Sequence, residues 1–194
     1  MNSTDLPSVT IVRHGETAWT VTGQHTGRTD IPLSPRGEEQ SRQLAVRLRE
    51  MRFSSVFTSP LQRATRTCEL AGFASVATAD ADLVEWDYGE YEGRRTAEIR
   101  ADRPGWGLFE DGCPQGESAA DVAARADRLI DRLRRGGGHV LLFGHRDMFR
   151  VMTARWLQFP ALEGRRFYLG TGSLSLLGYD HATSEPVIRL WNEG

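Results

Sequence analysis

Residues 8–15 read Ser-Val-Thr-Ile-Val-Arg-His-Gly, and this stretch carries the fold prediction. Its first five residues are mostly β-branched or small, a composition typical of a short buried strand. A second stretch, residues 139–145, reads His-Val-Leu-Leu-Phe-Gly-His and is equally apolar at its centre. Two central strands are therefore predicted, and each leads directly into a histidine, His14 after the first strand and His145 after the second.

Strand and helix patterns alternate along the chain on both sides of these two runs. Further strands are expected at 55–58, 74–78, 173–179 and 186–191, the last two as a hairpin at a sheet edge. Helices are expected at 35–51, from Ser59-Pro60 onward, at 118–135 and at 149–157. This alternation predicts an α/β fold, a three-layer sandwich whose mostly parallel central sheet carries helices on both faces.

The stretch from Leu83 to Glu117 has no clear period, because glycine, aromatic and acidic residues alternate in it. One short helix is expected there, at about 96–102. In a compact domain such a stretch is usually a functional loop or a lid. Since 194 residues suit one compact domain, we expect a single domain over residues 1–194, with a lid or insertion at about 94–117.

The charge and the apolar pattern exclude several classes of protein. A formal net charge of -2 provides no basic field for nucleic acid or for an acidic membrane surface. No apolar run approaches the roughly 20 residues that cross a bilayer, and Met1–Ser8 has no apolar signal core. Cys68 and Cys113 are expected to be free thiols. The chain is therefore interpreted as a cytoplasmic protein, and a homodimer is left open.

All 24 basic residues are arginine, and the chain contains no lysine. A Schiff-base lysine and a Walker-type phosphate loop are thereby excluded. Any anion site must therefore use arginine, histidine or backbone amides.

The expected topology brings such groups together. In open α/β sheets the ligand site lies outside the carboxyl ends of the strands, so His14 and His145 reach one crevice if their strands are neighbours. The strand at 55–58 would deliver Arg63 to the same crevice, from the first turn of the following helix. Helix amino termini add backbone donors there. Because the planar guanidinium fork binds two oxygens at once, this arrangement predicts a pocket for a phosphate group.

At these residues the chain resembles the histidine phosphatase superfamily, the group that contains the cofactor-dependent phosphoglycerate mutases. The resemblance covers nearly the whole chain, and its motifs occur in the expected order. They are Arg-His-Gly-Glu-Thr at 13–17 followed by Trp19, Ser-Pro-Leu-Gln-Arg-Ala at 59–64, Glu-Trp-Asp-Tyr-Gly-Glu-Tyr-Glu-Gly at 85–93, and Gly-His at 144–145. Residues 86–89 and 111–117 resemble the subgroup that includes a yeast sedoheptulose-bisphosphatase and a mycobacterial acid phosphatase.

The resemblance implies a metal-independent phosphatase of the phosphoglycerate mutase-like fold. His14 would attack phosphorus and become a phosphohistidine. Arg13, Arg63 and His145 would hold the phosphoryl oxygens. Glu85 would give its proton to the leaving group and later take one from water. No metal or other cofactor is implied, and an acid pH optimum is expected because low pH keeps Glu85 protonated.

The same resemblance suggests residues that contact the substrate, and it shows where the chain departs from the family. The expected contacts are Thr20, Thr26, Gly27, Tyr88 and Arg146. Arg146 stands where the family usually has glycine, and Asp147 stands where many relatives have histidine. Arg146 could add a cation to the pocket or point away from it. Asp147 could steady an arginine or His145, or weaken the binding of a dianion.

The favoured reading is a phosphatase for sugar phosphates or other small phosphorylated metabolites, with a small-molecule phosphate ester as its partner. Thr96 stands where the mutase pattern has a lysine, which counts against a phosphoglycerate mutase. A phosphate-ester binding protein without turnover is a second alternative, prompted by Arg146 and Asp147. A metal site built from His14, Glu16, His145 and Asp147 is disfavoured, because the neighbouring arginines would repel a divalent cation.

Overall fold

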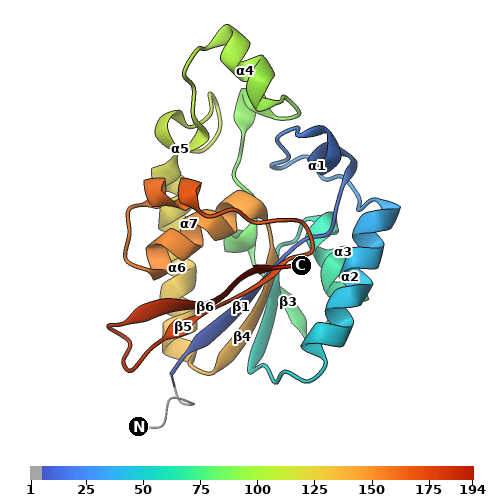
Figure 1. The fold of residues 1–194 in the computed structure, drawn as a ribbon, viewed down its shortest axis with the longest axis vertical. Helices are drawn as coiled ribbons and strands as arrows, with labels where there is room; N and C mark the ends of the chain where they lie inside the picture. Colours follow the sequence, from blue (N-terminus) through green and yellow to red (C-terminus); the bar gives the residue numbers. More distant parts are fainter. Residues whose placement is uncertain (1–5) are drawn as a thin grey trace.

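Six strands form one mixed sheet in a computed structural model that describes residues 6–194 (Figure 1). Their order across the sheet is β3-β2-β4-β1-β5-β6. The strands are β1 (Ser8–Arg13), β2 (Ser55–Thr58), β3 (Ala77–Ala79), β4 (His139–Gly144), β5 (Leu174–Tyr179) and β6 (Pro186–Glu193). Most of the amino-terminal segment that was expected to lack a signal core, residues 1–5, lies outside the described residues.

The two strands that lead into histidines are direct neighbours at the centre of the sheet. β1 pairs with β4 in parallel, with Arg13 opposite Gly144. β2 extends the parallel part on the far side of β4, and β3 follows it. β5 runs antiparallel to β1 and forms the edge hairpin with β6. The predicted mostly parallel sheet and its edge hairpin are both confirmed.

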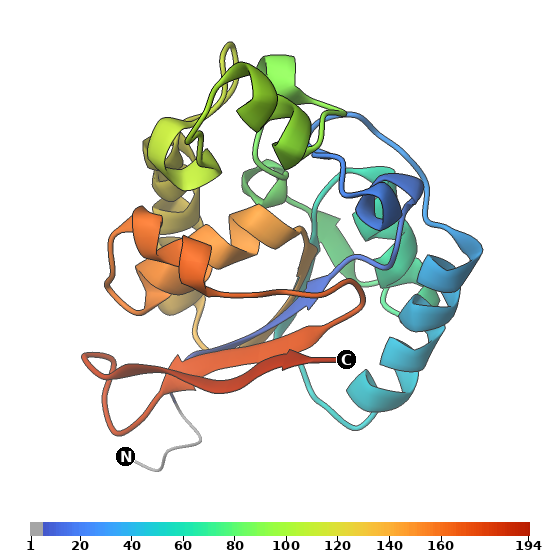
Figure 2. The same cartoon turned by 45° about the horizontal axis from the view of Figure 1, so that its top comes forward.

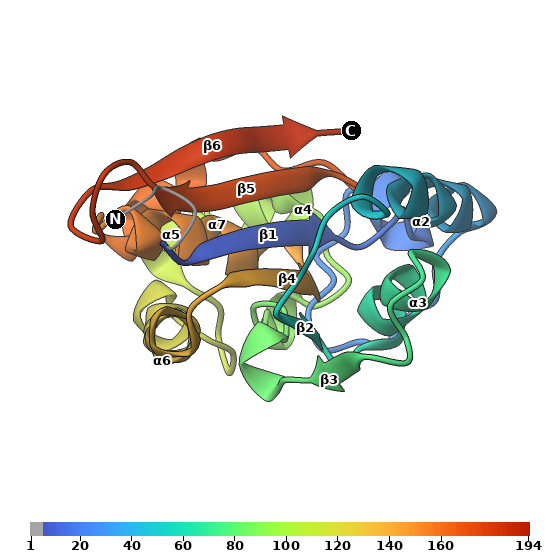
Figure 3. The same ribbon diagram turned by 90° about the horizontal axis from the view of Figure 1, so that it is seen from below.

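Helices cover both faces of the sheet, as Figure 3 shows with α6 and α7 on one side and α2 and α3 on the other. The helices are α1 (Ala18–Thr22), α2 (Pro35–Leu48), α3 (Gln62–Leu70), α4 (Thr96–Asp102), α5 (Leu108–Asp111), α6 (Ala119–Gly136) and α7 (Arg146–Trp156). Short 3-10 turns lie at η1 (Ala81–Leu83), η2 (Gly89–Tyr91) and η3 (Ala161–Arg166). The three-layer prediction is confirmed.

Alternating strand residues build the two cores. Val140 and Leu142 of β4 pack into the larger apolar cluster, with residues of α6 and α7. Leu141 and Phe143, the residues between and after them, pack into the second cluster with residues of α2 and α3. Since successive side chains of a strand point to opposite faces, one apolar run supplies both layers.

Several element boundaries differ from the sequence prediction. α2 ends at Leu48 rather than at about Met51, although Ser34 caps it as expected, its hydroxyl accepting from the Gly37 amide at 3.1 Å. β3 begins at Ala77, three residues later than predicted. Helices α1 and α5 were not predicted, because five and four residues are too few to show a helical period.

Two helix starts near the carboxyl ends of the strands also differ from the prediction. Ser59 does not cap α3, whose N-cap is Leu61 without a side-chain hydrogen bond. α7 begins at Arg146 and not near Phe149, because His145 has extended backbone angles and the helix starts at the next residue. Ser59 therefore directly follows β2, and Arg146 is the first residue of α7.

The predicted insertion at 94–117 contains α4 and α5 and lies at the same end of the molecule as α1 (Figure 2). The predicted helix at 96–102 is confirmed as α4. Trp106 and Phe109 of this segment are buried, and Trp106 packs edge-on against His25 and Tyr91. Both residues belong to the larger apolar cluster, so the insertion packs onto the main core. Its movement as a lid stays a prediction.

None of the helices in the described part of the chain combines the length and the apolar character required to cross a bilayer.

Candidate active site

His14 and His145 meet at the carboxyl ends of β1 and β4. The parallel register places Arg13 opposite Gly144, so the two histidines follow at equivalent positions. Their ring centroids are 5.2 Å apart, and their exposed fractions are only 3% and 0%. The two histidines therefore meet as predicted, although only His14 lines the cavity described below.

The backbone of the next residue sets the tautomer of His14. Its Nδ1 lies 2.7 Å from the carbonyl oxygen of Gly15, which can only accept a hydrogen bond. Nδ1 must therefore carry the hydrogen, and the lone pair is on Nε2. The residue after His14 packs directly against α2. An added Cβ on Gly15 would lie 2.2 Å from the carbonyl oxygen of Gly37.

Ser59 holds the ring of His145. Its Oγ lies 2.7 Å from Nε2 of His145, and it reaches this position from the end of β2. When the hydroxyl donates to Nε2, the ring hydrogen is on Nδ1. Nδ1 is buried and has no hydrogen-bond partner among residues 6–194. In that tautomer, Nδ1–H is a donor available to a group that enters the pocket.

In Arg13 and Arg63, terminal Nη nitrogens are hydrogen-bonded, but the Nε nitrogens have no partner among residues 6–194. Nη1 of Arg13 donates to the carbonyl oxygen of Leu169 at 2.6 Å. Nη2 of Arg63 donates to the carbonyl oxygens of Gly27 at 2.7 Å and Thr26 at 3.1 Å. The Nε atoms of both, like Nε of Arg146, are buried without a partner in the described part of the chain. Unpartnered buried donors on three arginines and one histidine are the arrangement that an anion would complete.

The electrostatic environment keeps both histidines neutral. Burial, then the charge of Arg63, lowers the pKa of His14 well below its usual value, and the same two causes act on the pKa of His145. Burial, together with the neighbouring Arg146, lowers the pKa of Arg13 to about 10, which leaves it charged at neutral pH. A neutral His14 with its lone pair on Nε2 is the reactive form of a histidine nucleophile.

Glu85 lies at the amino terminus of α7 and is 3% exposed. Its carboxylate accepts hydrogen bonds from the amides of Met148 at 2.9 Å, Trp86 at 3.0 Å and Asp147 at 3.1 Å. These amides favour the ionised form, but burial and the charge of Asp147 act against it. The pKa of Glu85 is raised in consequence.

Asp147 is buried beside Glu85 and is paired with other groups. Its Oδ1 accepts from Nη1 of Arg150 at 2.6 Å, and its Oδ2 accepts from the Tyr88 hydroxyl at 2.6 Å. Burial alone would raise the pKa of Asp147, but Arg150 and Arg146 outweigh it and hold the pKa at about 2. Asp147 therefore steadies Arg150, an arginine that the sequence did not single out, rather than His145.

A cavity of about 120 Å³ opens onto these groups. Seven of the predicted site residues line it: Arg13, His14, Thr20, Thr26, Glu85, Tyr88 and Arg146. Arg146 thus faces the cavity. Arg63 and His145 do not line the cavity and are fully buried. A larger groove of about 630 Å³ beside α3 contains none of the predicted site residues.

Two of the expected substrate contacts have local partners. The amide of Gly27 donates to Oε1 of Glu92 at 2.6 Å, and Gly27 does not line the cavity. The Thr20 hydroxyl donates to the Thr17 carbonyl oxygen at 2.8 Å and accepts from the Thr17 amide, which caps α1. Thr20 lines the cavity, but its hydroxyl already makes two hydrogen bonds within the cap of α1.

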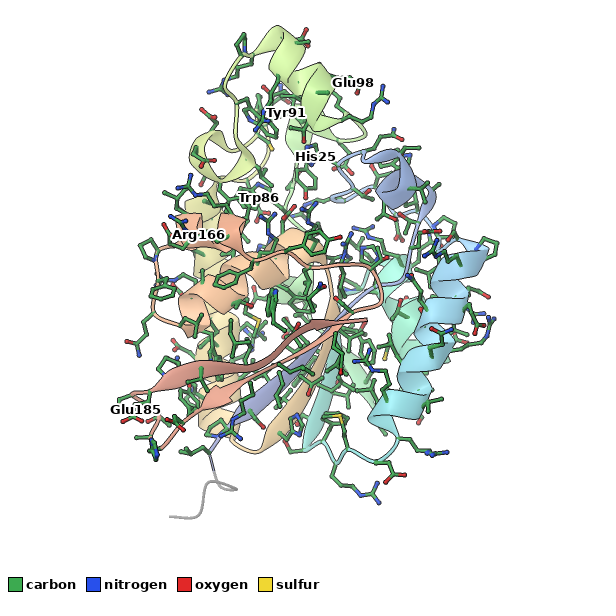
Figure 4. All side chains as sticks on the ribbon, viewed as in Figure 1. His25, Trp86, Tyr91, Glu98, Arg166 and Glu185 are labelled. Carbon is green, nitrogen blue, oxygen red and sulfur yellow. The ribbon has the colours of Figure 1, made fainter. Side chains whose placement is uncertain are left out.

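The sequence reasoning missed His25, which lines the cavity. Its Nε2 lies 3.2 Å from the hydroxyl of Thr96, and its ring centroid is 4.7 Å from that of Tyr88. In the view of Figure 4, His25 lies at the end of the molecule that carries α4, in the region of Trp86 and Tyr91. Its position directly before the Thr26-Gly27 motif was the available signal.

The alternative metal site is not assembled. Asp147 is bound by Arg150 and Tyr88, and Glu16 accepts from the Ser34 hydroxyl at 2.8 Å. Across residues 6–194 the one group of ligand-type side chains close enough for an ion is Asp180, His181 and Glu185. That group is exposed in the β5–β6 turn.

Comparison with known proteins identifies a family and close relatives. The family described as the histidine phosphatase superfamily, branch 1, matches residues 9–194. An acid phosphatase from Mycobacterium tuberculosis is 37% identical over 179 residues, which covers 90% of this chain and 88% of that protein. A sedoheptulose 1,7-bisphosphatase from Saccharomyces cerevisiae is 34% identical over 188 residues, covering 78% and 69%.

The fold has a close match among solved structures. The structure of an open-reading-frame product from Mycobacterium tuberculosis superimposes with a TM-score of 0.90 and 34% sequence identity. The match covers 96% of this chain and 97% of that chain. Both the predicted subgroup and the predicted fold agree with these matches.

Proposed function

The chain belongs to the histidine phosphatase superfamily and is a phosphatase, and from this premise we propose a role for each residue of the pocket and a class of substrate. One observation carries the proposal. A neutral His14, with its lone pair on Nε2, stands beside unpartnered buried donors on Arg13, Arg63, Arg146 and His145. This set suits the transfer of a phosphoryl group to a histidine.

In the first step, Nε2 of His14 forms a bond to phosphorus while the bond from phosphorus to the ester oxygen breaks. Glu85, protonated, gives its proton to that oxygen, so an alcohol leaves. Arg13 and Arg63 balance the charge on the phosphoryl oxygens, and Nδ1–H of His145 donates to one of them. The Nδ1–H bond to Gly15 holds the His14 ring while it becomes a phosphohistidine.

In the second step, a water molecule attacks phosphorus and the bond to Nε2 breaks. Glu85, now a carboxylate, takes the proton of that water. Inorganic phosphate leaves, and both His14 and Glu85 return to their starting forms. The arginines supply the positive charge for both steps, so the mechanism requires no metal ion.

We propose sugar phosphates and other small phosphorylated metabolites as substrates. The relatives named as an acid phosphatase and as a sedoheptulose 1,7-bisphosphatase support this class. The cavity of about 120 Å³ suits a phosphoryl group and a small part of the ester, with Arg146 and Tyr88 as further contacts. Thr96, at the position of the mutase lysine, pairs with His25 and supplies no cation there, which favours hydrolysis over mutase activity.

We also propose a cytoplasmic location. Cys68 and Cys113 are free thiols, and burial raises the pKa of each to about 12, which suits a reducing compartment. Cell fractionation tests this proposal. The homodimer stays a prediction, which light scattering of the purified protein tests.

The proposed function is tested by hydrolysis of p-nitrophenyl phosphate over roughly pH 4 to 8 in the presence of a chelator, a range that brackets the histidine and glutamate pKa values. The native protein should turn over and form an acid-labile phosphoryl adduct. His14→Ala should show neither, with its folding confirmed by thermal unfolding. Turnover that survives in His14→Ala, or that is lost with the chelator, would overturn the phosphohistidine mechanism.

A further inference from the structure

Two buried carboxyl groups share the amino terminus of α7, and the mechanism above uses only one. Glu85 accepts hydrogen bonds from the backbone amides of Asp147 and Met148. Asp147 presents its own carboxylate from the same helical turn, and both residues line the cavity. Both side chains are almost fully buried, so water screens their mutual repulsion only weakly.

The surroundings of Asp147 favour its ionised form. Nη1 of Arg150 and the hydroxyl of Tyr88 each donate to it at 2.6 Å, one to each carboxylate oxygen. Arg150 is itself held by the carbonyl oxygens of Gly164 at 3.1 Å and Arg165 at 2.7 Å. The negative charge at Asp147 is thus fixed in place by one hydrogen bond to each carboxylate oxygen.

Among the described residues, no arginine side chain is hydrogen-bonded to the Glu85 carboxylate. Its hydrogen-bond partners are backbone amides. A proton donor must nevertheless remain protonated near the charges that bind phosphate. The charged and titratable groups that face Glu85 come from β1, α3, the loop after Glu85, α6 and α7: Arg13, Arg63, Tyr88, Arg125, Arg146 and Asp147.

Four of these six groups are cations, and each of them favours the ionised form of Glu85. Tyr88 is neutral, since burial raises its pKa well above the usual value. Asp147 is the one negative charge in the set, and it opposes the arginines.

We propose that Asp147 is a positioning residue whose fixed negative charge keeps the catalytic proton on Glu85 until the leaving group departs. The proposal rests on the proposed role of Glu85 as proton donor. Two neighbouring carboxyl groups with different partners divide the roles of acid and anion between them. Burial and the charge of Asp147 both raise the pKa of Glu85, in agreement with this division. The chain thereby replaces the histidine that many relatives have at this position.

The test is the pH dependence of kcat/KM, which reports the free enzyme. The substrates are glycerol 2-phosphate, whose alkoxide needs a proton, and p-nitrophenyl phosphate, whose leaving group does not. With glycerol 2-phosphate, kcat/KM falls on the alkaline side of the profile (the alkaline limb) as Glu85 loses its proton. In Asp147→Asn this fall should occur about one pH unit lower, because the pKa of Glu85 is lower without the neighbouring charge. Asp127→Asn, the same change at a surface pair with Arg155, should leave the limb in place.

The asparagine carbonyl oxygen can still accept from Arg150, and its amide nitrogen can donate to the Tyr88 hydroxyl oxygen. The fold should therefore be retained, and thermal unfolding checks this. Asp147→His is a second variant that also removes the charge and restores the residue of the family pattern. It should move the limb in the same direction. An unchanged limb in whichever of the two variants folds would overturn the proposal.

Infrared spectroscopy gives a readout that is independent of turnover. The native protein should show a carboxylic acid C=O band that persists above the pKa of free glutamate, about 4.3, and the band should be lost in Glu85→Gln. In Asp147→Asn this band should disappear at lower pH than in the native protein. A band that titrates alike in both proteins would overturn the role of Asp147.

Failure of the proposed mechanism, with Glu85 as proton donor, can be distinguished from failure of the proposed role of Asp147. If Glu85→Gln slows both substrates equally, Glu85 is not the proton donor and the proposed mechanism fails. If Glu85→Gln slows glycerol 2-phosphate selectively while both Asp147 variants behave like the native protein, only the role of Asp147 fails.

Discussion

At the scale of single residues, the pocket depends on neighbours that hold the tautomers of its histidines. The carbonyl oxygen of Gly15 fixes the hydrogen of His14 on Nδ1, which leaves Nε2 to react. The Ser59 hydroxyl contacts Nε2 of His145, and when it donates to that nitrogen the ring hydrogen is on Nδ1, where it faces no other partner among residues 6–194. The two rings thus present opposite nitrogens, one as nucleophile and one as donor.

Ser59→Ala should therefore lower kcat/KM with p-nitrophenyl phosphate by roughly ten- to a hundredfold. The buried Nε2 of His145 would lose its partner, a change that costs about 1–3 kcal/mol. Ser175→Ala is the matched control, because it removes a buried hydroxyl that binds the Asn192 amide on the edge strands. The two variants are compared in steady-state kinetics. Equal kcat/KM for both would show that Ser59 does not orient His145.

At the scale of elements, the active site is placed by short connections that leave the central strands. The loop after β1 packs onto the first turn of α2, with Gly15 and Gly37 in backbone contact. An added Cβ on Gly37 would lie 2.1 Å from the carbonyl oxygen of Glu16, a position that only a backbone shift could relieve. This contact couples the position of α2 to the residues directly after His14.

Gly37→Ala should destabilise the protein by about 1–3 kcal/mol, the usual cost of overpacking. At about 2–4 °C per kcal/mol for a chain of this size, Tm should fall by several degrees. The control is Gly136→Ala at the end of α6, where an added Cβ meets nothing within 4 Å. Scanning calorimetry compares the two variants. A Tm for Gly37→Ala equal to that of the control would mean that the loop after β1 can shift to accept the Cβ without loss of stability.

At the scale of the whole molecule, folding buries several ionisable groups in one region to build the pocket. His14 and His145 are buried in their neutral forms, so folding is linked to pH. Below pH 6.5, the ordinary histidine value, the unfolded chain takes up protons that the folded chain does not. Stability from these two groups is therefore complete above pH 6.5 and is lost as pH falls toward the lowered folded pKa values.

The free energy of unfolding should thus decrease between pH 7 and pH 5, by at most about 1.4 kcal/mol per pH unit for each histidine. His14→Gln should reduce this slope, because one of the two groups no longer titrates. Glu85 contributes with the opposite sign, but it does so in both proteins, so the difference in slope isolates His14. His181→Gln, at an exposed turn, is the control. Urea unfolding at several pH values gives the slopes, and parallel slopes for all three proteins would contradict neutral burial of His14.

Much of the fold and the centre of the site could be predicted from local sequence. The apolar runs before His14 and His145 are strands because β-branched and apolar residues suit a sheet that is buried on both faces. Once those strands are parallel neighbours, the two histidines must meet, and Arg63 follows from the strand beside them. The chemistry of the pocket was therefore readable from motifs at strand ends.

The rest depended on contacts between residues far apart in the chain. Ser59 and His145 are 86 positions apart, Tyr88 and Asp147 are 59 apart, and His25 and Thr96 are 71 apart. No local pattern reports such pairs, because hydrogen bonds between distant side chains form only when packing brings them together. The sequence by itself predicted which histidines and arginines lie together at the ends of the central strands. Only the tertiary structure decided that Glu85 lies beside Asp147, 62 positions away, so that the pKa of one buried carboxyl group is lowered and that of the other is raised.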